Sequence, residues 1–107
     1  MALSENEIKA IKELRLKLSE CYSVGDFRVF GSKATGADMA DSDIDLMILL
    51  ENTSPVIESD IDDMIFEINL KYDCLLSAVF FSRHELEDGP FGESPVYKKA
   101  IAEGIQL

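Results

Sequence analysis

Residues 27–50 read FRVFGSKATGADMADSDIDLMILL, and this stretch decides the fold. It begins and ends with apolar runs, at residues 27–30 and 44–50, which predict two strands. The second run is apolar on both faces, which indicates a central strand covered on each side. Between the runs, Gly31-Ser32 breaks the first strand, and the small residues that follow predict one or two turns of helix. The first strand therefore runs directly into the N-terminus of a helix.

The rest of the chain reads as a series of short elements around this stretch. An amphipathic helix is expected from Ser4, where a capping box starts it, until Gly25 stops the apolar run. Further helices are expected to open at Ser54 and Ser94, each of which is followed by a proline. Residues 75–81 predict a third strand. The expected order is α-β-α-β-α-β-α.

The composition is that of an ordinary globular chain. It has 107 residues, of which 47% are hydrophobic and 29% are charged. Because it contains no repeat, low-complexity tract or linker-like segment, we expect residues 1–107 to form one domain. No apolar run approaches the roughly 20 residues that span a bilayer, and the N-terminus has no export pattern. We therefore expect a cytoplasmic protein with no membrane contact.

The net charge of the chain limits the classes of molecule that it is expected to bind. Ten Lys and Arg residues against 21 Asp and Glu residues give a net charge of -11, so the field of the chain repels phosphate backbones. Direct nucleic-acid binding is therefore not expected. A nucleotide can still bind where divalent metal ions screen its phosphates, and an acidic chain suits a basic protein partner.

A pair of carboxylates opens the second strand. Because side chains alternate along a strand, Asp43 and Asp45 are expected on one face, with Cα atoms about 6.5 to 7 Å apart. Met47 and Leu49 make that face otherwise apolar, so two ionised groups there carry a desolvation cost that a cation or solvent must offset. Mg²⁺ prefers carboxylate and phosphate oxygens, so the pair is a candidate metal site. Taken alone, however, such a pair is more often simply solvated.

The turn after the first strand supplies the second part of the candidate site. Gly31 allows a close turn, and Ser32 can present a hydroxyl and a backbone N–H at the positive end of the next helix. Such a turn can hold the phosphates of a nucleotide. Phosphoryl transfer depends mainly on positioning and charge neutralisation, so this turn and the two carboxylates fit one reaction.

The spacing resembles a known signature. Gly31-Ser32, followed after nine residues by Ser-Asp-Ile-Asp-Leu, is similar to the motif of the DNA polymerase beta nucleotidyltransferase superfamily, and the small size resembles its minimal nucleotidyltransferases. The resemblance implies a fold of the α/β (α+β) class, with a short mixed sheet of three or more strands flanked by about four helices. It also implies Mg²⁺ as cofactor and ATP or another nucleoside triphosphate as substrate. Many members resemble antitoxins encoded beside a HEPN-type RNase toxin, and some transfer AMP to a tyrosine of that toxin.

The family's residues carry over to this chain one by one. Gly31 and Ser32 match the phosphate-binding turn, and Asp43 and Asp45 match the two metal-binding catalytic aspartates. The third family carboxylate lies on the next strand, where this chain has Leu75 or Ser77 on the relevant face. Asp73 is the local acidic residue that can take the catalytic place, although it equally fits a turn before the strand.

Two functions from different classes follow. The first is an Mg²⁺-dependent enzyme that transfers a nucleoside monophosphate, AMP from ATP, to a hydroxyl of a partner protein. The second is a catalytically weak or inactive binding module that neutralises a partner by forming a complex. A position for the third carboxylate too far from the other two would slow or abolish transfer and favour the second function. The nucleotide preference, the acceptor and a homo- or hetero-oligomeric state stay open.

Overall fold

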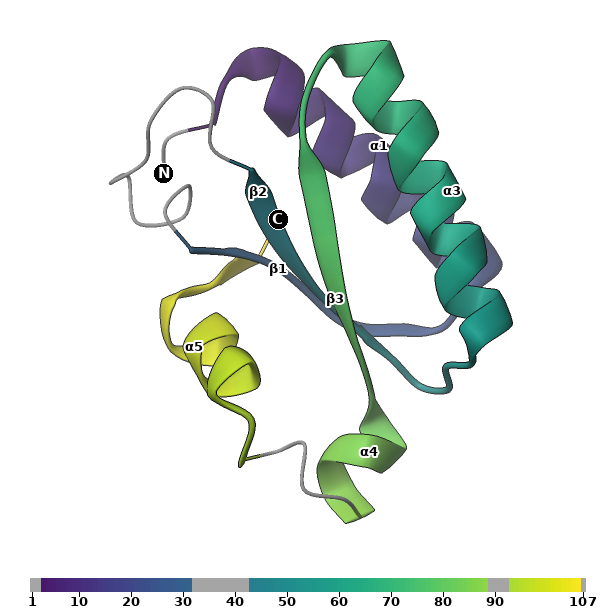
Figure 1. Cartoon of the computed structure of the whole chain (residues 1–107), viewed down its shortest axis with the longest axis vertical. Helices are drawn as coiled ribbons and strands as arrows, with labels where there is room; N and C mark the ends of the chain where they lie inside the picture. Colours follow the sequence, from purple (N-terminus) through teal and green to yellow (C-terminus); the bar gives the residue numbers. More distant parts are fainter. Residues whose placement is uncertain (1–2, 32–42, 89–92, 107) are drawn as a thin grey trace.

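A computed structural model of the chain describes residues 3–31, 43–88 and 93–106 (Figure 1). In these ranges the elements are α1 (Glu5–Cys21), β1 (Val24–Phe30), β2 (Ile44–Leu50), α3 (Pro55–Tyr72), β3 (Leu76–Ser82), α4 (Arg83–Asp88), α5 (Pro95–Glu103) and β4 (Ile105–Gln106).

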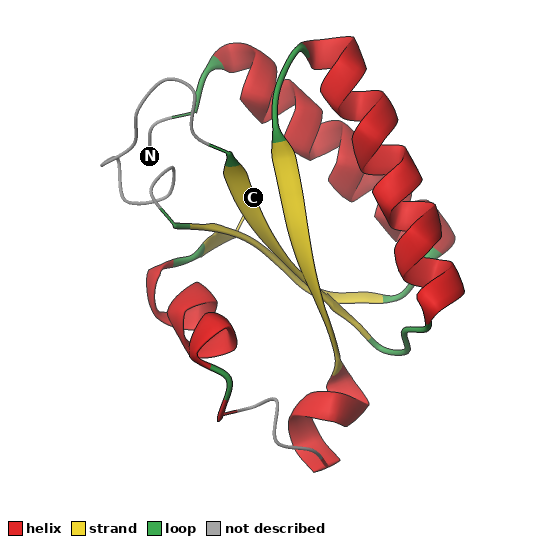
Figure 2. Cartoon of the chain, in the orientation of Figure 1, coloured by secondary structure: helices red, strands yellow, loops and turns green. Residues whose placement is uncertain are grey.

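The strands form one mixed sheet in the order β3-β2-β1-β4 (Figure 2). β1 is antiparallel to β2 and to β4, whereas β2 and β3 run parallel. All seven residues of β2 pair with β3, from Ile44 opposite Leu76 to Leu50 opposite Ser82. The α3 helix makes the crossover between these two parallel strands, as parallel pairing requires. The expected α/β fold with a short mixed sheet is confirmed.

Helices cover both faces of the sheet, so β2 is buried on each side (Figure 1). Ile44, Leu46, Ile48 and Leu50 belong to the larger core, which α1 and α3 close. The intervening Met47 and Leu49 belong to a second core, in which Ala100 of α5 is fully buried. Burying each such Leu or Ile side chain contributes about 1.5 to 3 kcal/mol. The expectation of a central strand covered on both sides is therefore confirmed.

The helices begin where their capping residues predict. The Ser4 hydroxyl accepts the Glu7 N–H at 3.2 Å, and the Glu7 carboxylate accepts the Ser4 N–H at 2.8 Å. Ser54 caps α3 and Ser94 caps α5, with a proline at the start of each helix. None of the helices in the described ranges is long and apolar enough to cross a membrane.

The structure differs from the predicted elements at several ends. Gly25 does not end the first helix, which stops at Cys21, but lies inside β1 at an irregularity in the pairing between Val24 and Asp26. The third strand begins one residue later than expected, at Leu76. The α4 helix and the two-residue β4, which Gln106 anchors by donating to Asp26 Oδ1 at 2.9 Å, had no clear periodicity to predict them. The helix expected just after Ser32 lies outside the described residues.

Candidate functional site

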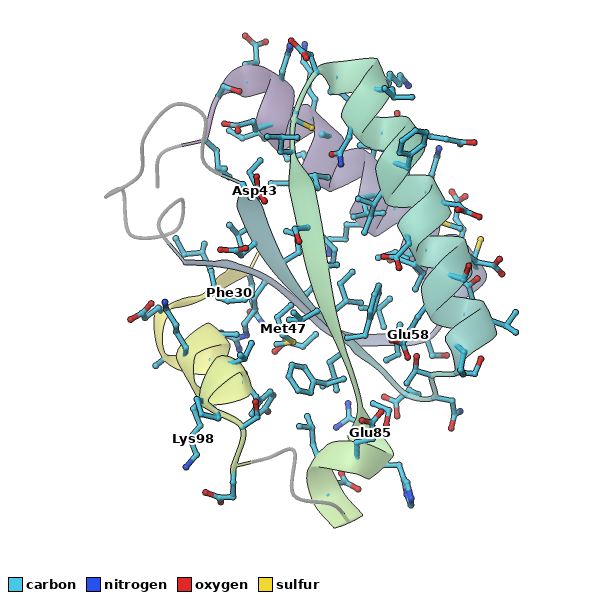
Figure 3. All side chains as sticks on the ribbon, in the orientation of Figure 1. Phe30, Asp43, Met47, Glu58, Glu85 and Lys98 are labelled. Atoms are coloured by element: carbon cyan, nitrogen blue, oxygen red, sulfur yellow. The ribbon has the colours of Figure 1, made fainter. Side chains whose placement is uncertain are left out.

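Asp43 lies immediately before β2 (Figure 3). Asp45 lies inside the strand and, like Met47 two residues later, on the face of the sheet that α5 covers. Asp43 is exposed just before the strand, whereas Asp45 is half-buried inside it. In the sheet, Asp45 has Phe30 of β1 as one register partner and Ser77 of β3 as the other. The alternation along β2 thus brings the two predicted carboxylates together on one face.

The surroundings of Asp45 oppose its negative charge. Burial and the neighbouring Asp43 carboxylate raise the pKa of Asp45 above its ordinary value, and Lys99 of α5 acts in the opposite direction. An aspartate held in this way gains from a cation placed between it and Asp43. At this position in β2, the negative charge of Asp45 destabilises the isolated chain but would attract a metal ion.

Gly31 ends β1 against the same carboxylate. It is buried and has a φ of +79°, a left-handed conformation that favours glycine. A Cβ atom at this position would lie 2.5 Å from Asp45 Oδ2. The turn thus passes so close to Asp45 that a side chain at this position would displace the carboxylate. Ser32, the other residue of the predicted phosphate-binding turn, lies outside the described residues.

Gly31→Ala is expected to lower the free energy of unfolding by about 1 to 3 kcal/mol, because alanine is strained at this φ and its methyl group must displace the Asp45 carboxylate. Thermal or urea unfolding measures the loss. Gly25→Ala is the matched control, since a Cβ there would approach closely only the end of the flexible Arg83 side chain, at 2.8 Å, with Leu49 and Glu51 at ordinary contact distances. We expect this control to cost less than about 1 kcal/mol. Equal losses in the two variants would contradict the close approach at Asp45.

Asp73, the acidic residue suggested in place of the third carboxylate, and Ser77, one of the two positions suggested for it, lie in different places. Asp73 is exposed at the C-cap of α3, where it adopts a left-handed φ of 53° and ends the helix. It lies four positions before Ser77, outside β3. Ser77 is the residue directly beside Asp45 on the parallel strand, and its side chain is exposed. On the β3 side, the structure therefore brings a hydroxyl, not a carboxylate, next to Asp45.

The donor set at this place suits a metal ion that shares its ligands with a substrate. Within residues 3–31, 43–88 and 93–106, no three His, Cys, Asp or Glu side chains are grouped closely enough to hold a metal ion. Two carboxylates on one face nevertheless fit Mg²⁺, which keeps several waters and commonly binds through one or two carboxylates together with substrate phosphates.

Lys99 is a residue of this site that sequence reasoning did not select. Ala100 is fully buried in the core that also contains Phe30, the register partner of Asp45, and this packing places the neighbouring Lys99 close enough to act on the Asp45 charge. The adjacent Lys98 instead pairs with Glu93 at 2.7 Å and points away from the sheet (Figure 3). The amphipathic pattern of the last helix was visible in the sequence, but only the packing of Ala100 shows which lysine faces the carboxylates.

Comparison with protein families gives one match along most of the chain. The family described as "Nucleotidyltransferase domain" matches residues 11–105, a range that contains Gly31, Asp43, Asp45 and Ser77. No curated protein matches the sequence.

Solved structures show the same fold at low sequence identity. A chain described as a minimal nucleotidyltransferase is 22% identical, with full coverage of both chains and a TM-score of 0.62. A toxin–antitoxin crystal structure with AMP-PNP is 15% identical and covers 96% of this chain and 72% of the other, with a TM-score of 0.62. A mutant of the toxin–antitoxin MntA–HpeT is 16% identical and covers 97% and 72%, with a TM-score of 0.59.

Proposed function

The chain belongs to the nucleotidyltransferase domain family, and from this premise we propose that it transfers a nucleoside monophosphate, AMP from ATP, to a hydroxyl of a partner protein. The observation that carries the proposal is the pair formed by Asp43, just before β2, and Asp45, which lies directly against the left-handed turn at Gly31. Family membership makes this the position at which nucleotide chemistry is expected.

In the proposed reaction, the acceptor hydroxyl oxygen forms a bond to the α-phosphorus of ATP. The bond from that phosphorus to the oxygen bridging it to the β-phosphate breaks, and pyrophosphate leaves with the electron pair. The hydroxyl proton passes to a base. Gly31 and Ser32 are proposed to hold the β- and γ-phosphates, and Asp43 and Asp45 would hold the metal ion.

The residues present fit Mg²⁺, which Asp43 and Asp45 would hold together with phosphate oxygens. The ion would supply neutralisation of the charge that develops on the transferred phosphate and the leaving group. The raised pKa of Asp45, caused by burial and by Asp43, supports this assignment because it indicates an electrostatic cost that a cation would remove.

A protein is proposed as the acceptor because the net charge of -11 does not suit RNA or DNA. Two of the structures with this fold come from toxin–antitoxin proteins, which supports a protein partner for this chain as well. We propose a partner of the HEPN toxin type, with this chain as its antitoxin.

One observation favours a second candidate function. Ser77, one of the two positions at which the resemblance expects the third carboxylate, is the register partner of Asp45, and Asp73 lies at the C-cap of α3. A serine hydroxyl is a poor acceptor for the proton of the attacking hydroxyl at neutral pH, so transfer would be slow. The chain would then act as a module that binds nucleotide and neutralises its partner by forming a complex.

Incubation of the chain with radiolabelled ATP, MgCl₂ and the protein encoded beside it tests the proposal. Label on the partner that disappears in Asp43→Asn is the expected result. The absence of label from every protein, in the wild type as in Asp43→Asn, would contradict transfer. Inhibition of the partner that survives both Asp43→Asn and Asp45→Asn, without any label, would instead support the binding module.

Lys99→Gln is expected to weaken ATP binding in the presence of Mg²⁺ by about tenfold, because the site loses the cation that opposes the charge at Asp45. Lys98→Gln removes the same charge one residue away, where the lysine pairs with Glu93. This control is expected to change the affinity by less than about twofold. Calorimetric titration measures both, and equal weakening in the two variants would contradict a role of Lys99 at the site.

A further inference from the structure

Three large apolar side chains remain exposed where α3 ends and β3 begins. Phe66 is 64% exposed and Leu70 is 70% exposed, one helical turn apart on α3, and Leu75 is 55% exposed just before β3. We call these three residues the apolar strip. Single exposed apolar residues are ordinary, but exposed apolar patches mark interaction sites, and these three residues lie within ten positions of one another.

Asn69 holds the two parts of the apolar strip together. Its side-chain oxygen accepts the Leu76 N–H at 2.8 Å, and its amide nitrogen donates to the Leu76 carbonyl at 3.2 Å. Its backbone carbonyl accepts the Cys74 N–H at 3.2 Å. The start of β3 is thereby fixed against the last turns of α3, so the apolar strip is a shaped surface.

Acidic side chains lie beside the part of the apolar strip that α3 carries. The α3 sequence contains five Asp and Glu residues and a single lysine. Asp62, Asp63 and Glu67 are exposed beside Phe66. The lysine, Lys71, is engaged by Glu13 of α1 at 2.7 Å. The rim is therefore negative and lacks a free cation of its own helix, which favours a partner with positive charge.

The apolar strip leads to the carboxylate end of the sheet. The Leu75 carbonyl accepts the N–H of Ile44, the residue between Asp43 and Asp45, at 2.8 Å. The parallel strands β2 and β3 begin at the same end of the sheet, next to the C-terminal end of α3 (Figure 1). A partner that lies along the apolar strip would therefore reach the neighbourhood of Asp43.

We propose that the apolar strip docks a helix of the partner protein that carries an apolar stripe flanked by lysine or arginine residues. The inference rests on the proposed function, to which it adds the surface that brings the acceptor to the site. Phe66 and Leu70 form a ridge that fits the groove between side chains of a second helix. Asp62, Asp63 and Glu67 pair with the basic flanks and fix the orientation of the docked helix.

The structure argues against two other occupants. The side chain of Asn69 already hydrogen-bonds the N–H and the carbonyl of Leu76 on the outer side of β3. These two backbone groups therefore cannot pair with an added strand. A second copy of the chain would bring identical acidic rims together in a two-fold contact, and juxtaposed like charges oppose association.

Fluorescence anisotropy with a labelled helical peptide that has leucines on one face and lysines on the other tests the proposal. The wild-type chain should bind this peptide. The variant Phe66→Ser/Leu70→Ser should bind it about tenfold more weakly or worse. Leu16→Ser, which removes an equally exposed apolar side chain from α1, should retain the wild-type affinity. Thermal unfolding checks that the variants fold.

A charge control separates the acidic rim from the net charge of the chain. Asp62→Asn/Asp63→Asn/Glu67→Gln should weaken peptide binding about tenfold. Glu20→Gln/Glu87→Gln/Glu103→Gln removes the same number of exposed charges elsewhere and should weaken it by less than about threefold. Equal losses in the two sets, or equal losses in Phe66→Ser/Leu70→Ser and Leu16→Ser, would overturn the proposal, as would failure of the wild-type chain to bind.

Binding of the peptide to the apolar strip does not depend on the proposed nucleotide site. Asp43→Asn should bind the peptide as the wild type does, because the apolar strip contains none of the groups proposed to hold metal or phosphate. Loss of nucleotide binding with normal peptide binding would refute the proposed function and leave the docking surface in place. The reverse pattern would refute the docking surface alone.

Discussion

Ser77→Asp is expected to raise the rate of nucleotidyl transfer by about 10²- to 10⁴-fold, the range that a positioned general base contributes. Ser77 lies beside Asp45 in the parallel register of β2 and β3, and its side chain is exposed at the site. A carboxylate in this place can take the proton of the acceptor hydroxyl as the bond to phosphorus forms. Transfer of label from ATP to the partner protein measures the change.

Ser77→Asn is the matched control, because asparagine has the shape of aspartate without its basicity. We expect this variant to transfer no faster than the wild type. The added negative charge in Ser77→Asp should also lower the melting temperature of the metal-free chain. The new carboxylate lies close to Asp45, whose ionised form burial already disfavours. Ser77→Asp and Ser77→Asn chains that both bind ATP and transfer label at the same rate would show that proton transfer does not limit the reaction.

Asp45→Asn is expected to lower transfer by about 10²-fold or more while raising the stability of the isolated chain. The variant loses a proposed metal ligand. It also loses a carboxylate whose negative charge is unfavourable in the folded chain. Because the pKa of Asp45 is raised in the folded chain, the native state at neutral pH carries a penalty that asparagine removes. As the pH falls below the ordinary value of 3.8, the carboxyl is protonated in both states and the gain disappears.

Urea unfolding at neutral and acidic pH measures this effect, with Glu20→Gln as a control at an exposed position of α1. The control is expected to leave both activity and stability nearly unchanged, and to show no such difference between the two pH values. An Asp45→Asn chain less stable than the wild type at neutral pH would contradict the account, because it would mean that the Asp45 carboxylate stabilises the folded chain.

Residues 44–50 show what the sequence could predict. A run that is apolar on both faces indicates a central strand, and the period of two along a strand places Asp43 and Asp45 on one side of it. The structure confirms the strand, and it shows Asp45 and Met47 on the face that α5 covers. These inferences depend on local periodicity, so they needed no knowledge of which elements pair.

Ser77, Gly25 and Lys99 show what local reasoning could not supply. The choice between Leu75 and Ser77 as the neighbour of Asp45 depends on the register between β2 and β3, which is set by the long crossover through α3. Gly25 suggested a helix stop because glycine weakens both helices and strands, and only pairing with β2 shows that it lies in β1. Lys99 and Lys98 are equivalent until the packing of Ala100 orients the helix.

Isothermal titration of the chain with ATP, in the presence and absence of Mg²⁺, tests the central claim most directly. We propose that Asp43, Asp45 and the turn at Gly31 form a nucleotide site that depends on a divalent cation. The account predicts saturable binding that requires Mg²⁺ and that falls by at least about tenfold in Asp43→Asn/Asp45→Asn. Absence of binding at millimolar ATP and Mg²⁺, or equal binding by this double variant, would contradict it.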